Sequence, residues 1–261
     1  MRVSLIITTF NRPDALLLVL KSVERQSTLP FEVIIADDGS NNDTKILINN
    51  FQSTSCLNII HSWQKDKGFR AAKSRNKAIA KSDGDYLILI DGDMILHSKF
   101  VQDHIKNAEI GYFIQGTRVM LNEAATKDLV NKINFCFSFT SPGLKNRKNA
   151  IHSDFLSTLF SKKRKYLSRI KSCNMAFYKK DCLSINGFNN DFEGWGREDS
   201  EFAARLLNIG IIRKNLRFNA IQFHLWHIEN TRSSLRKNDV ILNSSINSNS
   251  KWCNNGIDKY L

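Results

Sequence analysis

Residues 85–93 of this chain read Asp85-Tyr86-Leu87-Ile88-Leu89-Ile90-Asp91-Gly92-Asp93. The apolar or aromatic run 86–90, followed by a turn signal, predicts a buried strand of a parallel sheet. Asp91 and Asp93 come directly after this strand, and in open α/β sheets ligands bind outside the carboxyl ends of the strands. Paired carboxylates suit Mg²⁺ or Mn²⁺ that carries a phosphate. An acidic turn without a ligand is the alternative, and the pair alone does not decide between the two.

The length and composition set the broad class of the chain. Its 261 residues and 42% hydrophobic content predict one large domain, or one domain with an appendage, around a substantial core. No apolar run approaches the roughly 18–20 residues that cross a membrane, and the first residues predict a core strand and not a signal peptide. The five cysteines form no Cys-x-x-Cys pair, so neither a disulfide framework nor a zinc site is indicated. We therefore expect a cytoplasmic location.

The first hundred residues alternate between segments of strand and helix character. The predicted strands are 3–7, 31–36, 57–60 and 86–90. The predicted helices between them begin near 13, 44 and 70. This alternation predicts an α/β fold with a mostly parallel, Rossmann-like central sheet flanked by helices.

Polar side chains follow three of these strands. Thr8 and Thr9 end the first strand and Asp37 and Asp38 end the second, in addition to the carboxylates after the fourth. No Gly-x-x-x-x-Gly-Lys-Ser/Thr sequence is present and the first turn contains no glycine, so the P-loop and the dinucleotide fingerprint are both missing. Hydroxyl and carboxylate groups at one sheet edge can instead bind a base and a ribose, beside a metal on a diphosphate.

These motifs resemble the amino-terminal half of an inverting family 2 glycosyltransferase with the GT-A fold. The motifs are Thr8-Thr9-Phe10-Asn11-Arg12, Asp37-Asp38-Gly39-Ser40, Arg75-Asn76 and Asp91-Gly92-Asp93-Met94. The resemblance implies a UDP-sugar as the donor and Mn²⁺ (or Mg²⁺) as the metal. The donor-binding residues that it implies are Thr8, Thr9, Asn11, Arg12, Asp37, Asp38, Arg70, Arg75, Asp91 and Gly92. It implies Asp93 as the direct metal ligand with Asp91 beside it, whereas a solvated helix face is the alternative for the two later arginines.

The segment around Trp195 carries a second group of candidate residues. Glycines flank Trp195, so the backbone can approach a ligand closely, and an indole ring can pack on a sugar. Glu198 and Asp199 follow at a predicted helix start, where the helix dipole favours an ionised carboxylate, as a general base requires. An acidic first turn without catalytic role is the alternative.

This segment resembles the Trp-Gly-x-Glu-Asp signature of β-1,4-galactosyltransferases and of chondroitin-type polymerases. The resemblance implies that Asp199 deprotonates the acceptor hydroxyl and that Glu198 holds the acceptor or the loop. It also implies Trp195 and Gly196 in the acceptor site. Arg197 stands where a second glycine is common, which is a small departure from the pattern.

The segment 218–227 predicts a strand that ends in histidine and contains two histidines. An imidazole of His224 or His227 could complete the metal site. Histidines three residues apart cannot easily both face one metal from an extended strand. The family pattern implies the later one, His227, and a structural histidine is the alternative.

Residues 145–171 hold nine Lys or Arg and one acid, a surplus of +8 within a formal net charge of +13. Within this segment Ile151, Phe155, Leu156, Leu159 and Phe160 share one face of a predicted helix. An apolar face beside a basic run suits an anionic membrane surface. A core helix beside a solvated basic loop is the alternative. No nucleic-acid partner is expected, because no nucleic-acid-binding motif is present.

We therefore expect a single GT-A domain in three parts. Residues 1–100 form the UDP-sugar-binding half, 101–228 the acceptor-binding and catalytic half with the basic segment 145–171, and 229–261 a C-terminal extension. A flexible connector is predicted at 243–250 within this extension.

The expected activity is metal-dependent, inverting transfer of a hexose or N-acetylhexosamine from a UDP-sugar. The expected acceptor is a hydroxyl of a bacterial surface glycan of lipopolysaccharide-core or capsule type, and the enzyme is expected to be cytoplasmic and peripheral at the inner face of the cell membrane. Two alternatives stay open: a non-catalytic basic surface-binding protein on the same scaffold, or one module of a capsule polymerase.

Overall fold

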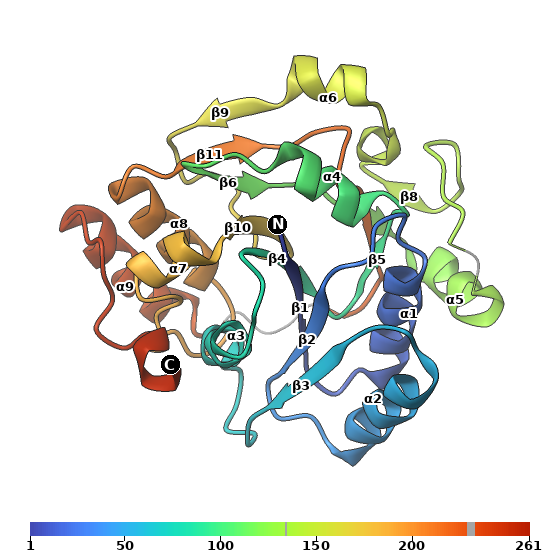
Figure 1. The fold of residues 1–261 in the computed structure, drawn as a ribbon, viewed down its shortest axis with the longest axis horizontal. Coiled ribbons are helices and arrows are strands. Elements are labelled where there is room, and N and C mark those ends of the chain that lie inside the picture. The colour runs from blue at the N-terminus through green and yellow to red at the C-terminus, as the bar shows by residue number, and fades with distance from the viewer. Residues whose placement is uncertain (134, 229–232) are drawn as a thin grey trace.

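The computed structural model describes residues 1–133, 135–228 and 233–261. The strands of its main sheet are β1 (Val3–Thr9), β2 (Glu32–Asp37), β3 (Ile59–Trp63), β4 (Tyr86–Asp91), β6 (Tyr112–Gln115), β9 (Lys162–Arg164), β10 (Asn174–Tyr178) and β11 (Ile212–Asn215). Across the described ranges these eight strands lie in the order β3-β2-β1-β4-β10-β6-β11-β9 through the centre of the molecule (Figure 1).

The two halves of this sheet differ in strand direction. Strand β1 pairs in parallel with β2 and β4, and β2 pairs in parallel with β3. Strand β10 runs antiparallel between β4 and β6, and β9 runs antiparallel to β11 at the sheet edge. The α/β class and the parallel first half are as predicted, and the second half mixes both directions.

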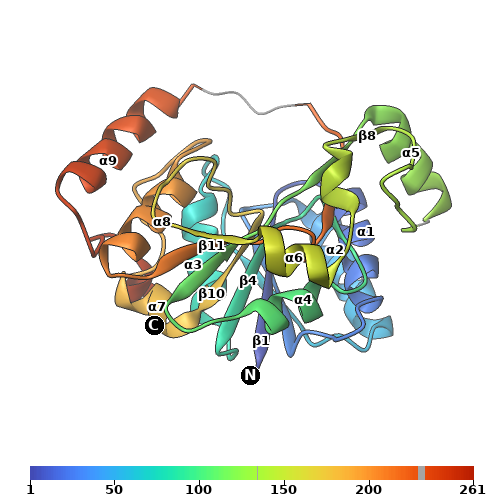
Figure 2. The same cartoon turned by 90° about the horizontal axis from the view of Figure 1, so that it is seen from above.

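Helices cover both faces of the sheet (Figures 1 and 2). They are α1 (Pro13–Glu24), α2 (Asn42–Thr54), α3 (Ala71–Ala80), α4 (Phe100–Asn107), α5 (Glu123–Lys132), α6 (Asp154–Phe160), α7 (Lys179–Ser184), α8 (Glu198–Asn208) and α9 (Leu235–Asn247), with short 3-10 helices at Arg147–Ala150 and Ile257–Tyr260. Successive residues of β1 point to opposite faces. Leu5 and Ile7 therefore enter the core under α1, α2 and α4, while Ile6 enters the core under α3, α7 and α8. Among the described helices, none is both long and apolar enough to span a membrane.

A smaller sheet brings the segment after β4 beside a segment near residue 222. It consists of β5 (Met94–Leu96), β7 (Val119–Leu121), β8 (Leu144–Lys145) and β12 (Gln222–His224), in the order β5-β12-β7-β8. Strand β5 follows β4 after a tight turn, and Met94 pairs with His224 in the antiparallel β5–β12 ladder. The carboxylates after β4 therefore lie beside the end of β12.

Two predicted segments differ in the structure. The third strand covers Ile59–Trp63 and not 57–60. It continues past residue 60 because β2 holds the polar side chain of His61, whose Nε2 lies 2.8 Å from Asp37 Oδ2. The segment 243–250, predicted as a flexible connector, is helical through Asn247. Here Ser245 Oγ donates to Glu201 Oε1 at 3.1 Å in a buried contact between α9 and α8, and this packing outweighs the weak helix preference of Ser and Asn.

The structure also contradicts one of the two interpretations of the basic segment 145–171. Its helix, α6, exposes Phe155 by 76% and Leu159 by 62%, so the alternative of a core helix is wrong. Residues 162–164, expected in a loop under that alternative, form the edge strand β9. The three-part division at 100 and 228 stays a prediction, and residues 229–232 lie outside the described ranges.

Candidate active site

Asp93, His224 and His227 form a cluster of metal-ligand atoms that all lie within 4.8 Å of one another. His224 Nε2 is 3.7 Å and His227 Nε2 is 3.3 Å from Asp93 Oδ2. The sequence argument that both histidines cannot easily face one metal is wrong, because β12 ends at His224 and His227 lies beyond the strand. The structure thus adds His224 to the candidate metal ligands. It pairs with Met94, the residue after Asp93, and this pairing brings its ring to the cluster.

Burial and charge prepare this cluster for a cation. Burial lowers the pKa of His224 to about 4, so its imidazole is neutral, as a metal ligand requires. Although burial opposes its charge, the hydrogen bond from His227 holds the pKa of Asp93 below its ordinary value. Among the described residues, Asp93 Oδ1 and His224 Nδ1 are buried and have no hydrogen-bond partner. The cluster therefore fits a divalent ion.

Arg75 connects the motifs at three strand and helix ends. Its guanidinium is almost fully buried and donates from Nε to Thr8 Oγ1 at 3.1 Å and from Nη1 to Glu198 Oε1 at 3.0 Å. Its Nη2 lies 3.4 Å from Asp91 Oδ1. Asp91 is thus paired with a cation and is outside the cluster formed by Asp93 and the histidines, although burial raises its pKa to about 6. The predicted roles of Arg75 on the diphosphate and of Asp91 on the metal stay predictions.

The two carboxylates after β2 have different surroundings. Asp37 Oδ1 accepts the backbone N–H groups of Gly39 and Ser40, so it shapes the turn itself. Gly39 has a φ of +105°, and an added Cβ would lie 2.5 Å from Asp66 Cα, so this turn requires glycine. Asp38 instead lies at the edge of a cavity, where its Oδ2 accepts the backbone N–H of Arg70 at 2.6 Å. Of the two carboxylates, Asp37 therefore forms the turn and Asp38 lines the cavity.

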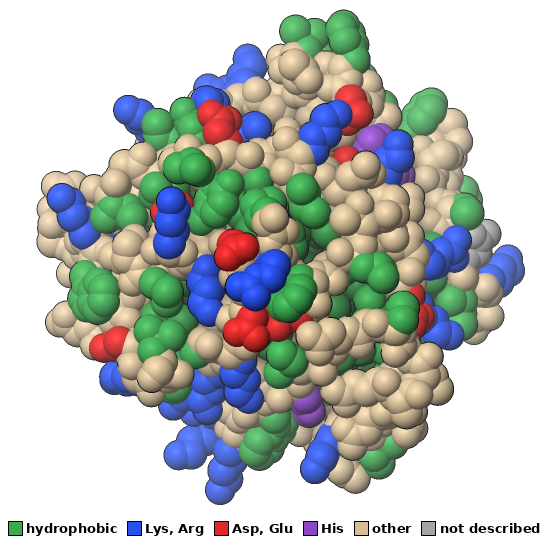
Figure 3. All heavy atoms as spheres, viewed as in Figure 1, with side chains coloured by type: hydrophobic (Ala, Val, Ile, Leu, Met, Phe, Trp, Pro, Cys, Tyr) green, Lys and Arg blue, Asp and Glu red, His purple; other side chains and the backbone are tan. Residues whose placement is uncertain are grey.

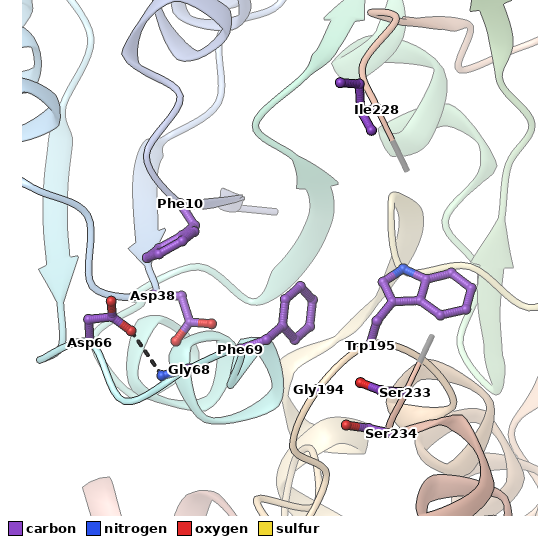
Figure 4. Close-up of a pocket in the computed structure, with 10 residues that line it drawn as sticks. All are labelled: Phe10, Asp38, Asp66, Gly68, Phe69, Gly194, Trp195, Ile228, Ser233 and Ser234. Atoms are coloured by element: carbon purple, nitrogen blue, oxygen red, sulfur yellow. Dashed lines mark hydrogen bonds between the residues drawn. The ribbon is translucent and has the colours of Figure 1, made fainter. Parts of the chain in front are cut away.

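That cavity has a volume of about 650 Å³ and joins the two halves of the chain. Phe10 and Asp38 lie on one side of it, Trp195 lies on the other, and Phe69 lies between them (Figure 4). The backbone N–H of Gly194 donates to the carbonyl of Phe69 at 2.9 Å, which ties the Trp195 loop to the loop before α3. Phe10 and Phe69 were not singled out from the sequence, although each is an aromatic residue in a loop next to a motif and each is partly exposed.

Arg12, in the loop after β1, contacts the metal-ligand cluster, and its predicted contact with the donor stays a prediction. Arg12 Nη1 lies 3.4 Å from Asp93 Oδ2, so its cation faces the metal-ligand cluster. Asn11 has a φ of +48°, and its side chain Oδ1 accepts the backbone N–H of Asn41. Gly92 N–H donates to Thr8 carbonyl at 2.7 Å, and a Cβ there would lie 3.0 Å from that oxygen. These contacts hold the β1 and β4 ends close together.

Glu198 and Asp199 begin α8 as predicted, and at Asp199 burial outweighs the helix dipole. Burial and the neighbouring charge of Glu198 raise the pKa of Asp199 to about 7, so the expectation of a carboxylate ionised by the helix start alone is corrected. Asp199 Oδ1 accepts the backbone N–H of Ser200 at 2.6 Å. Arg197 has a φ of +79°, the left-handed region that glycine favours, and its Nε donates to Asp239 of α9 at 2.6 Å. A base with a pKa near neutrality is suited to proton abstraction.

A second group of ligand types, His97, Asp103 and His152, has its ligand atoms within 4.8 Å as well. Asp103 Oδ2 accepts the backbone N–H of Ala220 at 2.8 Å, and Ala220 has a left-handed φ of +49°. The rings of His97 and His152 stack with 12° between their planes. Because each nitrogen lone pair lies in its own ring plane, stacked rings do not point at one ion. This cluster holds a loop in place.

The chain shows clear similarity to known proteins. Its residues 4–183 match the family described as Glycosyl transferase family 2, and residues 156–228 match the family described as N-terminal domain of galactosyltransferase. It is 29% identical over 229 residues to a hyaluronan synthase of Pasteurella multocida, which covers 82% of this chain and 23% of that protein. It is 28% identical over 242 residues to a chondroitin synthase of Escherichia coli, which covers 85% of this chain and 34% of that protein.

The chain thus spans about a quarter to a third of the length of these relatives. Its fold resembles that of S. aureus TarS 1-349 in complex with UDP, with a TM-score of 0.63 and 15% identity over 93% of this chain and 64% of that chain. The GT-A fold expected from the sequence is confirmed by this likeness. Because the family match at 4–183 covers more than half of the chain, the chain belongs to glycosyl transferase family 2, a family of glycosyltransferase enzymes.

Proposed function

We propose that this chain transfers a hexose or N-acetylhexosamine from a UDP-sugar to a glycan hydroxyl, with inversion at the anomeric carbon and dependence on a divalent metal. The observation that carries the proposal is one protein that combines a metal-ligand cluster, a cavity-lining carboxylate and a half-buried carboxyl with a raised pKa. Asp93, Asp38 and Asp199 supply these three parts from separate segments of the chain.

Asp93, His224 and His227 would hold the metal. A bound Mn²⁺ would neutralise the charge that develops on the diphosphate of the leaving nucleotide. The two imidazoles favour a transition-metal ion such as Mn²⁺ over Mg²⁺, which prefers oxygen ligands. The cation of Arg12, beside Asp93, would add positive charge on the same side.

The donor nucleotide would occupy the cavity next to this cluster. Asp38 and Thr8 would bind the uridine, with Thr9, Asn11 and Asp37 shaping the surrounding turns and Arg70 near the diphosphate. The volume of about 650 Å³ lies within the range of pockets for ligands of this size. The likeness to a protein described in complex with UDP supports this choice of nucleotide.

Asp199 would act as the general base. It takes the proton of the acceptor hydroxyl while the hydroxyl oxygen bonds to the anomeric carbon, and the bond from that carbon to the UDP oxygen breaks on the opposite face. Glu198 is held by Arg75 and keeps the pKa of Asp199 high, while Trp195 and Gly196 would support the acceptor sugar. In this proposal the base and the leaving group act on opposite sides of one sugar.

The acceptor that the relatives support is a surface polysaccharide of capsule type. This chain covers only 23% of the hyaluronan synthase and 34% of the chondroitin synthase, so we keep a second candidate, one module of a capsule polymerase. Lipopolysaccharide core is the other acceptor class proposed. A lipid-linked acceptor would place the enzyme in the cytoplasm at the inner face of the membrane. A non-catalytic scaffold is disfavoured, since Asp93 and Asp199 are both present in their sites.

A panel of nucleotide sugars scored by UDP release, with and without Mn²⁺, tests the proposal. The Asp199→Asn variant should bind UDP normally and lose roughly 100- to 10,000-fold in transfer, the usual contribution of a general base. The matched control Asp83→Asn, an exposed carboxylate outside the site, should transfer at the wild-type rate. Transfer by Asp199→Asn near the wild-type rate would show that another group is the base, and no UDP binding or turnover with any donor would refute the enzyme.

A further inference from the structure

Helix α6 presents an apolar face to solvent at the edge of the molecule. Phe155, Leu159 and Phe160 are all exposed, although they lie on a helix of only seven residues. Hydrophobic side chains stand at the upper rim of Figure 3, where α6 lies in Figure 1. A contiguous exposed apolar cluster of this kind marks an interaction site and not a folding requirement.

A basic cavity of about 530 Å³ lies next to this face. Its lining includes Phe139, Arg147, Lys148, Ile151 and Arg217. The guanidinium of Arg217 lies over the ring of Phe218 at 5.6 Å, and that ring is 5.7 Å from the ring of Phe160 on α6. The cavity and the apolar face are therefore parts of one continuous surface.

The cations of this surface are not neutralised by neighbouring acids. Asp154, the sole acid of residues 145–171, pairs with Lys106 at 2.8 Å. Within the described part of the chain, Arg147 and Lys148 have no carboxylate within ion-pair distance, and neither has Arg217. The surface thus combines free positive charge with exposed aromatic and aliphatic groups.

We propose that this surface docks on an anionic phospholipid bilayer. We call it the α6 surface and define it by Arg147, Lys148, Phe155, Leu159, Phe160 and Arg217. The cations would bind lipid phosphates while the apolar side chains enter the boundary between headgroups and acyl chains. Nucleic acid or a soluble anion would use the charges and leave the apolar face in water, so a bilayer matches both halves of the surface.

Sedimentation of the full chain with lipid vesicles tests this docking. Vesicles of phosphatidylcholine mixed with phosphatidylglycerol should bind the chain, more weakly at high salt, and vesicles of phosphatidylcholine alone should not. The triple variant Arg147→Gln/Lys148→Gln/Arg217→Gln should lose roughly fivefold in partition per charge, on the order of 100-fold in total. The charge-matched control, Lys45→Gln/Lys81→Gln/Lys251→Gln, changes exposed lysines elsewhere and should retain most of the binding.

A second variant separates the apolar contribution. Phe155→Ser/Leu159→Ser changes side chains that are mostly exposed, so it should leave the melting temperature unchanged and lower binding to anionic vesicles roughly tenfold or more. The proposal would be overturned if both triple variants lost vesicle binding equally. It would also be overturned if the chain bound neutral and anionic vesicles equally. Self-association that the double variant abolishes would assign the surface to a second copy of the chain and overturn it too. The readout is membrane binding and not sugar transfer, so this proposal and the proposed chemistry fail independently.

Discussion

The protonation of Asp199 gives the sharpest prediction for the proposed reaction. Burial and the charge of Glu198 raise its pKa to about 7, and a base works only when it is ionised. The rate should therefore fall as the pH falls below 7. At one pH unit below that pKa about a tenth of the carboxylates are ionised, so kcat/KM should be about tenfold lower than its plateau.

The variant Glu198→Gln tests the physical cause of this pH dependence. It removes the negative charge that disfavours ionisation of Asp199, and it keeps an amide oxygen that can still accept from Arg75 Nη1. The acidic limb of the profile should consequently move to lower pH. Glu193→Gln, in the loop that precedes the same helix and exposed to solvent, is the matched control and should leave the limb in place.

The assay is UDP release at a fixed Mn²⁺ concentration from pH 5 to 9, with kcat/KM taken at each pH because it reports groups of the free enzyme. A flat profile between pH 5 and 8 would contradict the assignment of Asp199 as a base with a pKa of about 7. If the acidic limb is present in the wild type and lies at the same pH in Glu198→Gln, Asp199 would still be the base. The charge of Glu198 would then not be the cause of its raised pKa. A limb that moves equally in both variants would attribute the shift to net charge.

Two further predictions concern the metal cluster and the core. The variants His224→Ala and His227→Ala should each lower Mn²⁺ affinity roughly tenfold or more in calorimetric titration, and wild-type affinity in His224→Ala would remove that residue from the ligand set. Glu201→Gln should lower the free energy of unfolding by roughly 3–5 kcal/mol in urea, because it leaves the fully buried Arg205 without its carboxylate partner. Glu123→Gln, which breaks an exposed ion pair, should change it by less than about 1 kcal/mol, and equal losses in both would contradict the role of burial.

The parallel half of the sheet was predictable because its strands are continuous apolar runs separated by helices. Burial on both faces requires such runs, and β1, β2 and β4 were found within one or two residues of their observed bounds. The antiparallel insertion of β10 between β4 and β6 was not predictable, since it depends on pairing between residues about 60 to 90 positions apart. Local pattern carries no information on which distant strand becomes a neighbour.

The same limit explains what was missed at the metal site. His224 was set aside because the strand was assumed to continue to His227, and in an extended strand the two rings would point to opposite faces. The strand instead ends at His224, where it completes its ladder with β5 at Met94. The end of a short strand is set by its partner, so the ligand geometry became visible only with the β5–β12 pairing.

Arg75 shows why the two sequence resemblances belong to one site. The resemblance implies that Arg75 meets the diphosphate, which stays a prediction, and the structure buries its guanidinium between Thr8, Asp91 and Glu198. The first two lie in the parallel half, and Glu198 lies in the segment that matches the galactosyltransferase family. Without this guanidinium, Asp91 and Glu198 would be partly buried carboxylates with no opposing charge, which is costly in a low dielectric. One buried cation therefore couples the carboxyl ends of β1 and β4 to the start of α8, and these contacts hold the two halves together without a ligand.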